Sequence, residues 1–421
     1  MGEKMKLLAS RVDVGAVFVA VLLWTAAVKN DRDQFLASEY WAALSLNPSL
    51  SVLKENHDVF LGILCIIFAF SVFRKHSLLI SGCIPAVIFI FLQIYITMRT
   101  SFTSEASIKH LFSIVLFSAA GVMFWNSAAR IGKALSVESI KIGIYFFSVA
   151  LILANLFNLL TGHGFVPGVA RLFGTSGHPN FLGVQLALCC LVFVDKIVLT
   201  RRLFRALNTA LFLAGLYLMA LTGSRTAIIV FSTGFVAFYV SWRRSFTLPF
   251  FAILFIFLFF VSQISDVALS AFGPAFDRGG AVNTRSEAWS ALWERVSASP
   301  IWGEGYMRGF TENSILRGWA AYGMVFPVVV MTLGSYAVYS LGRYSFSSMG
   351  DFYRLYFCIV LGILVGGIFE GYLADTYSTP VLLYLYCLLV CPRRINLGSK
   401  KVEETSLYPK NVHSKMVNLK S

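Results

Sequence analysis

Charged residues are scarce in this sequence, and their scarcity excludes most soluble folds. Only 13% of the 421 residues are charged, whereas 57% are hydrophobic, and the mean hydropathy is +0.73. A globular protein of this length needs more polar surface than that to remain in water. The composition therefore predicts an integral membrane protein whose side chains are solvated mainly by lipid.

Paired cysteines and clustered carboxylates are also missing. The seven cysteines (65, 83, 189, 190, 358, 387 and 391) lie in apolar stretches, without the spacing of a metal site or a disulfide framework. The polar loops on the predicted outer side hold no cluster of carboxylates for Mg²⁺. We therefore expect no disulfide, no metal site and no cofactor.

The net charge of +14 does not indicate nucleic-acid binding, because the cations stand in short runs between apolar segments and not on one face. Such runs set membrane topology. With a cytoplasmic N-terminus, 23 of the 35 Lys and Arg residues fall inside and 12 outside. This bias predicts that both termini are cytoplasmic.

Apolar runs close to the about 20 residues that cross a bilayer predict twelve transmembrane helices. They cover residues 12–28, 58–73, 77–98, 110–126, 141–160, 180–199, 204–222, 226–242, 247–264, 318–341, 354–373 and 377–391. The predicted fold is all-α. Helices 1 to 9 occupy residues 1–264, an exoplasmic loop 265–317, helices 10 to 12 residues 318–391, and a basic cytoplasmic tail 392–421.

The long loop contains a predicted amphipathic helix. Thr284 and Glu287 have the spacing of a capping box, and Ser299-Pro300 ends the segment. Apolar residues follow the cap at helical spacing: Trp289, Leu292, Trp293 and Val296. We expect this helix to lie in the outer headgroup layer or to pack on the mouth of the helix bundle.

Three arginines on the predicted outer side are candidates for binding phosphate. Arg171 lies in the polar stretch 161–179, Arg225 at the mouth of a helix, and Arg285 at the start of the loop helix. The planar guanidinium stays charged and binds two oxygens at once. Arg225 is the strongest candidate, since a charge at the membrane boundary is costly unless it faces a cavity or a ligand. The alternative is an arginine that only anchors the helix end.

Two outer carboxylates, Glu312 and Glu370, are candidates for a general base. For Glu312 the alternative is helix capping together with Thr311 and Asn313. His178 lies in a turn beside Pro179, where histidine is more often structural. The glycine-rich residues 303–309 follow no predicted strand and have one residue too many for a dinucleotide fingerprint, so we interpret them as a flexible turn.

Three blocks together resemble the bacterial O-antigen ligase and polymerase family. Residues 171–183 read RLFGTSGHPNFLG, residues 222–227 read TGSRTA, and the third block runs from Arg285 to Gly323. The resemblance covers residues 171–335, with the blocks in the family's order. One departure is clear: where the family commonly has histidine before an asparagine, this sequence has Glu312-Asn313.

The resemblance implies a metal-independent glycosyltransferase with a GT-C-like bundle in the bacterial inner membrane. Its donor would be a glycan on undecaprenyl pyrophosphate, and its partners an acceptor glycan, membrane lipid, a flippase and a chain-length regulator. Arg171, Arg225 and Arg285 are assigned to the pyrophosphate, and Glu312 with Arg225 to catalysis. The secondary candidates are Asn313, His178, Asn180 and Glu370.

The leading functional prediction is a polysaccharide polymerase acting at the periplasmic face. The sibling alternative is an O-antigen ligase with a lipid or protein acceptor. A flippase or transporter needs charges near the bilayer midplane, of which the sequence shows almost none, and no repeats or paired broken helices are seen. A non-enzymatic assembly subunit is the fourth possibility.

Overall fold

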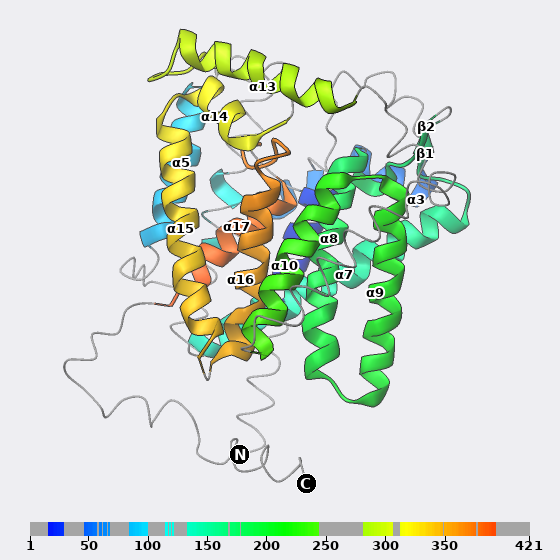
Figure 1. Cartoon of the computed structure of the whole chain (residues 1–421). Helices are drawn as coiled ribbons and strands as arrows, with labels where there is room; N and C mark the ends of the chain where they lie inside the picture. The colour runs from blue at the N-terminus through cyan, green and yellow to red at the C-terminus, as the bar shows by residue number, and fades with distance from the viewer. Residues whose placement is uncertain are drawn as a thin grey trace, which may run out of the picture. The chain divides into compact units, whose positions relative to one another are not determined.

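The computed structural model describes residues 16–28, 46–56, 84–99, 133–166, 169–176, 178–243, 281–305, 312–347, 349–375 and 378–392, with parts of 59–67 and 114–121 (Figure 1). The predicted span 247–264 and almost all of the predicted basic tail lie outside these residues. Contacts divide the chain into Met1–Cys391 and Pro392–Ser421. Everything below concerns the first unit.

Helices make up most of the described residues. In chain order they are Ala16–Ala27, α3 (Pro48–Glu55), α5 (Ile84–Arg99), α7 (Lys133–Leu160), α8 (Pro179–Leu199), α9 (Arg202–Thr222), α10 (Arg225–Arg243), α13 (Ala281–Ala298), α14 (Ser314–Tyr322), α15 (Val325–Ser345), α16 (Gly350–Gly366) and α17 (Thr379–Val390). A short antiparallel pair, β1 (Phe165–Val166) and β2 (Val169–Leu172), departs from the all-α prediction.

Five helices are long and apolar enough to cross a membrane. They are Ser136–Leu160, Pro179–Leu199, Arg202–Thr222, Arg225–Trp242 and Val325–Ser345. Shorter apolar helices cover Ala16–Ala27, Ile84–Arg99 and Thr379–Val390. Several apolar helices of this kind indicate a multi-pass membrane protein, whereas the predicted number of about twelve spans is not established by the described residues.

The predicted span 318–341 is wrong as a single helix. Gly323, with φ +77°, breaks it into α14 and α15. A Cβ at this position would lie 2.1 Å from the Ile301 carbonyl oxygen, so only glycine fits the break. Because hydropathy counts apolar residues and not backbone breaks, the sequence pattern joined the two helices. The predicted boundary between residues 317 and 318 consequently falls inside α14.

Helix α8 is the most deeply buried of the five long apolar helices and packs against α7, α9, α10, α16 and α17. Figure 1 shows α8, α9 and α10 as neighbouring green helices. Gly183 allows the closest approach: a Cβ there would lie 2.6 Å from the Ser224 Cβ and 2.8 Å from the Thr222 hydroxyl. The start of α8 is therefore pressed against the turn between α9 and α10.

The segment before α8 is folded back onto α7. The backbone N–H of Thr175 donates to the Asn155 side-chain oxygen at 3.1 Å, and the Asn155 amide donates to the Thr175 hydroxyl at 3.0 Å. Gly174, with φ +52°, supplies the left-handed turn between β2 and this contact. Strand β2 and the start of α8 are thereby held at the same end of the helices, which we call the site end.

Candidate active site

The turn between α9 and α10 sets the position of Arg225. Gly223 adopts a left-handed conformation and ends α9, with its N–H bonded to the Ala220 carbonyl. The Ser224 hydroxyl then accepts the N–H of Ala227 at 3.2 Å, which satisfies a free donor at the start of α10. Arg225 is consequently the first residue of α10, half-buried at a helix N-terminus.

Arg171 reaches this turn from β2. Its Nε donates to the Thr222 carbonyl at 2.7 Å, and its Nη2 donates to the Asn180 side-chain oxygen at 2.6 Å. The guanidinium is therefore fixed against the residue three positions before Arg225. Arg171 and Arg225 are both predicted to bind phosphate. The structure places the segments that carry them, β2 and the start of α10, together at the site end.

Glu370 lies at the centre of the same cluster. Its Oε1 accepts the Asn180 amide at 2.9 Å and the Thr226 hydroxyl at 3.0 Å, and the residue is 2% exposed. We call Arg171, Asn180, Thr226 and Glu370 the site network. The network joins β2, α8, α10 and the turn after α16 through one amide, one hydroxyl and two charged side chains.

The start of α14 is attached to the backbone around Glu370. The N–H of Ser314 donates to the Gly367 carbonyl at 2.7 Å, and its hydroxyl donates to the Glu370 carbonyl at 2.6 Å. Glu312 stands two residues before Ser314, within about 7 Å along an extended chain. The two predicted carboxylates therefore belong to the same region of the molecule.

Asn313 caps α14, and this resolves the alternative considered for Glu312. The Asn313 side-chain oxygen accepts the N–H groups of Ile315 and Leu316 at 3.0 and 3.1 Å. Its φ of +57° makes it the one non-glycine residue with positive φ in the described chain, a conformation that asparagine tolerates. Glu312 is half-buried and makes no hydrogen bond or ion pair with the described residues. Helix capping belongs to Asn313.

A buried ion pair lies beside the site network, and the sequence did not predict it. Arg317 Nη1 contacts Asp375 Oδ1 at 3.1 Å, with the two side chains 6% and 1% exposed. Arg317 lies one turn after Ser314, and Asp375 lies between the last two predicted spans. Asp375 could have been noticed as an acidic residue in the short predicted outer segment between these spans. Nothing in the sequence pattern indicated that Arg317 is its partner.

His178 precedes the first residue of α8 and does not cap the helix with its side chain. Desolvation and, to a smaller extent, the positive charge of Arg171 lower the pKa of His178 to about 3. The imidazole is consequently neutral near pH 7. It adds no positive charge for a phosphate group.

The loop helix is confirmed, but its predicted capping box is wrong. Helix α13 already includes Ala281, so Thr284 lies inside it, and the side chain of Arg285 falls outside the described residues. Leu292 and Val296 of α13 pack against α14, and Trp293 makes an edge contact with Trp319. The helix therefore packs on other protein segments, one of the two predicted placements.

Residues 303–305 of the glycine-rich turn make contacts with other segments. Glu304 pairs with Arg295 of α13, and its N–H donates to the Ala320 carbonyl at 2.8 Å. Arg99 of α5 donates to the Trp302 carbonyl at 2.9 Å. These contacts connect α5, α13 and α14. Residues 306–309 are not described.

Within the described ranges, no group of three or more His, Cys, Asp and Glu side chains is arranged to hold a metal ion. The charged side chains of the site end include Arg171, Arg225 and Arg317, and Arg317 is already paired with Asp375. Arg171 and Arg225 are the cations there that could contact an anionic ligand. Guanidinium groups bind phosphate and carboxylate oxygens in pairs.

Comparison with known proteins supports one class. The family model described as O-antigen ligase matches residues 210–329, which include the TGSRTA turn, α13 and α14. No curated protein sequence matches the chain significantly. Over residues 210–329 the chain is therefore similar to the O-antigen ligase and polymerase family, whose members are glycosyltransferase-like membrane enzymes.

Proposed function

We propose that this protein transfers a glycan from undecaprenyl pyrophosphate to an acceptor hydroxyl at the periplasmic face of the inner membrane. The observation that carries the proposal is the fixed placement of Arg171 against the turn that begins with Thr222 and holds Arg225. Arg225 at the N-terminus of α10, with Arg171 bonded to the turn just before it, provides a site for an anion with two phosphates. Arg285 remains a proposed third contact.

In the proposed reaction, the acceptor hydroxyl attacks the anomeric carbon of the donor sugar. The bond from that carbon to the pyrophosphate oxygen breaks, and undecaprenyl pyrophosphate leaves with its negative charge held by Arg171 and Arg225. Pyrophosphate is a good leaving group and needs little acid assistance, so charge stabilisation and a base supply most of the catalysis. No step requires a metal ion.

Glu312 is the proposed general base that takes the proton of the acceptor hydroxyl. Its carboxylate is half-buried, has no partner among the described residues, and is released from capping by Asn313. Glu370, in contrast, already accepts two hydrogen bonds on one oxygen. We assign Glu370 a positioning role, in which it holds Asn180 and through it the Arg171 guanidinium.

A polymerase is our first choice of activity, because glutamate replaces the histidine common in the family and because the exoplasmic loop is compact. A ligase is the second candidate, favoured by the description of the matching family model. The two differ in acceptor. A polymerase accepts another lipid-linked repeat unit, whereas a ligase accepts a finished lipid or protein molecule.

The test is a reconstituted reaction of the full chain in liposomes with undecaprenyl-pyrophosphate-linked repeat units, in excess EDTA. A ladder of products without added acceptor is the expected result for a polymerase. A single transfer that depends on an added lipid acceptor would select the ligase. If neither product forms at any metal concentration, the proposed function is wrong, and a strict Mg²⁺ requirement would contradict its metal-independent mechanism.

A further inference from the structure

A small pocket lies next to the site network. It is lined by residues from the first helix, from the turn before α8 and the start of α8, and from the segment that leads into α17: Ala26, Ala27, Ser176, Phe181, Gln185, Asp375, Ser378 and Pro380. Phe181 directly follows Asn180 of the network, and Asp375 is the partner of Arg317. The enclosed volume of about 10 Å³ holds one water-sized group.

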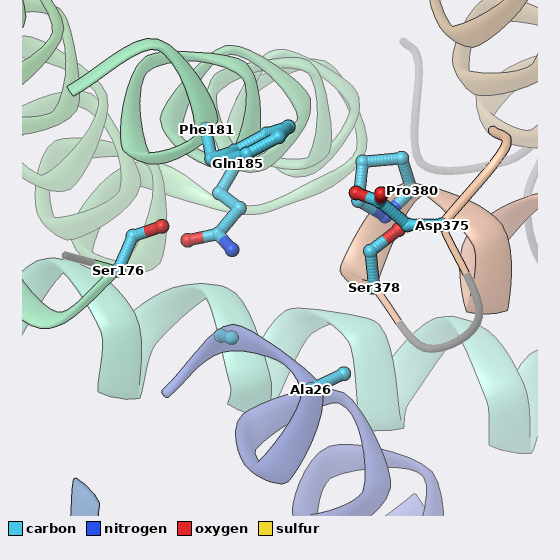
Figure 2. A pocket seen from close by; sticks show the side chains of 8 residues that line it. Ala26, Ser176, Phe181, Gln185, Asp375, Ser378 and Pro380 are labelled. Atoms are coloured by element: carbon cyan, nitrogen blue, oxygen red, sulfur yellow. The ribbon is translucent and has the colours of Figure 1, made fainter. Parts of the chain in front are cut away.

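Gln185 is the notable side chain of this pocket. It is 4% exposed, and its side-chain oxygen is buried without a hydrogen-bond partner in the described part of the chain. Its amide nitrogen makes only a long contact of 3.5 Å with the Thr379 hydroxyl. Figure 2 shows the amide extending into the space between Ser176 on one side and Asp375 with Ser378 on the other. A buried amide oxygen without a partner costs stability unless a ligand or water satisfies it.

The lining limits what fits. The pocket combines an amide, two hydroxyls and a carboxylate with the apolar surfaces of Phe181 and two alanines. Its lining residues include no Lys or Arg for a phosphate oxygen, and the Asp375 carboxylate is paired with Arg317. A neutral group that donates and accepts one hydrogen bond matches this lining, and a hydroxyl on an apolar ring is such a group.

We propose that the pocket binds one hydroxyl of the glycan substrate, with the Gln185 amide as its hydrogen-bond partner. The inference rests on the proposed glycosyl transfer and extends it to sugar recognition. Gln185 lies five residues after Asn180, about 7.5 Å further along the axis of α8 and about 140° around it. The pocket is therefore beside the site network, on the neighbouring face of α8. The hydroxyl belongs to the donor sugar or to the acceptor sugar. The chemistry recognised is the same in both cases.

The experiment compares kcat/KM for native substrates with that for substrates lacking one hydroxyl. One arm uses single-deoxy donors with the native acceptor, and the other uses the native donor with single-deoxy acceptors. For wild-type protein, removal of the recognised hydroxyl in one arm is expected to lower kcat/KM about 10-fold, the value of one net hydrogen bond. The arm that shows the loss identifies the source of the hydroxyl.

The variant Gln185→Leu is then expected to lower kcat/KM for native substrate by about the same factor and to treat native and deoxy substrates alike. The matched control is Gln93→Leu. Gln93 of α5 is also buried, at 2% exposed, with an amide nitrogen without a partner, but it lies outside the pocket. The control is expected to discriminate like the wild type.

The outcomes separate the two proposals. If wild-type protein transfers no glycan, the proposed function fails and the pocket with it. If the wild type is active and Gln185→Leu keeps both its kcat/KM and its discrimination, the pocket holds only an ordered water and the inference is overturned. Should Gln185→Leu fold poorly, Ser176→Ala provides a second variant, and it is expected to weaken the same discrimination by a smaller factor.

Discussion

The two ends of the described helices bury charge in different ways. At the end opposite the site, which we call the basic end, Lys141 of α7 pairs with Asp195 of α8 at 2.7 Å, and these side chains are 1% and 0% exposed. The Lys141 ammonium also donates to the Asp351 carbonyl at 2.8 Å, and Asp351 pairs with Arg354 at 3.1 Å. The site end also holds a direct buried pair, Arg317–Asp375 at 3.1 Å. Within the site network, however, Arg171 and Glu370 are linked only through the neutral side chain of Asn180.

This difference separates charges that hold helices together from charges that serve a ligand. In the Lys141–Asp195 pair each charge neutralises the other, and the pair connects α7, α8 and the start of α16. Its members are buried so deeply that removing one leaves the other without compensation. The site network instead orients an arginine through its neighbours. Replacements in the Lys141–Asp195 pair should therefore change stability, and replacements in the site network should change activity.

The largest expected effect is at Arg225. Arg225→Ala should lower turnover about 10³-fold, in the range for loss of one preorganised donor to a developing oxyanion. Arg225→Lys should recover only a little, because a point charge does not replace the planar fork. Steady-state transfer in liposomes measures both, with Arg343→Ala as control, since Arg343 is exposed in the last turn of α15. Lost expression or insertion of Arg225→Ala would point to a structural role.

At the basic end, Lys141→Met should destabilise the protein by about 3–5 kcal/mol, because the buried Asp195 carboxylate loses its partner. The double variant Lys141→Met/Asp195→Leu should regain most of that stability. Denaturation in detergent measures the free energy of unfolding. Turnover per folded molecule should stay close to the wild-type value in both variants. A large loss of turnover without loss of stability would remove the distinction between the two ends.

Glu312→Gln should lower turnover about 10²-fold, the usual contribution of a general base. Glu312→His should recover part of this loss, since imidazole is a competent base near neutral pH. Glu294→Gln on the exposed face of α13 is the control, and no change is expected there. Normal turnover by Glu312→Gln would exclude Glu312 as the base and make Glu370→Gln the next variant.

The smallest effect should be at Asn180. Asn180→Leu removes the link between Arg171 and Glu370 but leaves both charges in place, so turnover should fall by about 10-fold, the value of one or two hydrogen bonds. The loss should appear mainly as weaker donor binding, because Arg171 is then less well oriented. A KM that is unchanged while kcat falls would indicate that Asn180 acts on the reaction itself.

Candidate site residues could be named from the sequence, but their contacts could not. The motif blocks pointed to Arg171 and Arg225, and the scarcity of carboxylates on the predicted outer side pointed to Glu370. The partners of Glu370 lie 190 and 144 residues away in the chain, at Asn180 and Thr226. Helical periodicity shows which face of a helix is buried, but it does not show which helices meet. The same limit hid the Lys141–Asp195 pair.

Other differences between the prediction and the structure concern single residues. Asn313 caps α14 with its side chain, and the helix begins at Ser314, four residues before the predicted span 318–341. The break at Gly323 depends on the close approach of the Ile301 carbonyl, a contact from a distant segment. Gln185 was not among the predicted site residues, because in the sequence it is a single polar residue within an apolar run. Only its unsatisfied oxygen in the folded chain distinguishes it.

We propose that the site end binds a lipid pyrophosphate through its arginines. The most direct measurement is the affinity of purified full-length protein in detergent for undecaprenyl pyrophosphate. Arg171→Ala and Arg225→Ala should each weaken binding by about 10-fold or more, the loss of a charge-assisted hydrogen-bonded contact. Arg343→Ala at the basic end should bind like the wild type. Unchanged affinity in both site variants, or an equal loss in Arg343→Ala, would contradict the account.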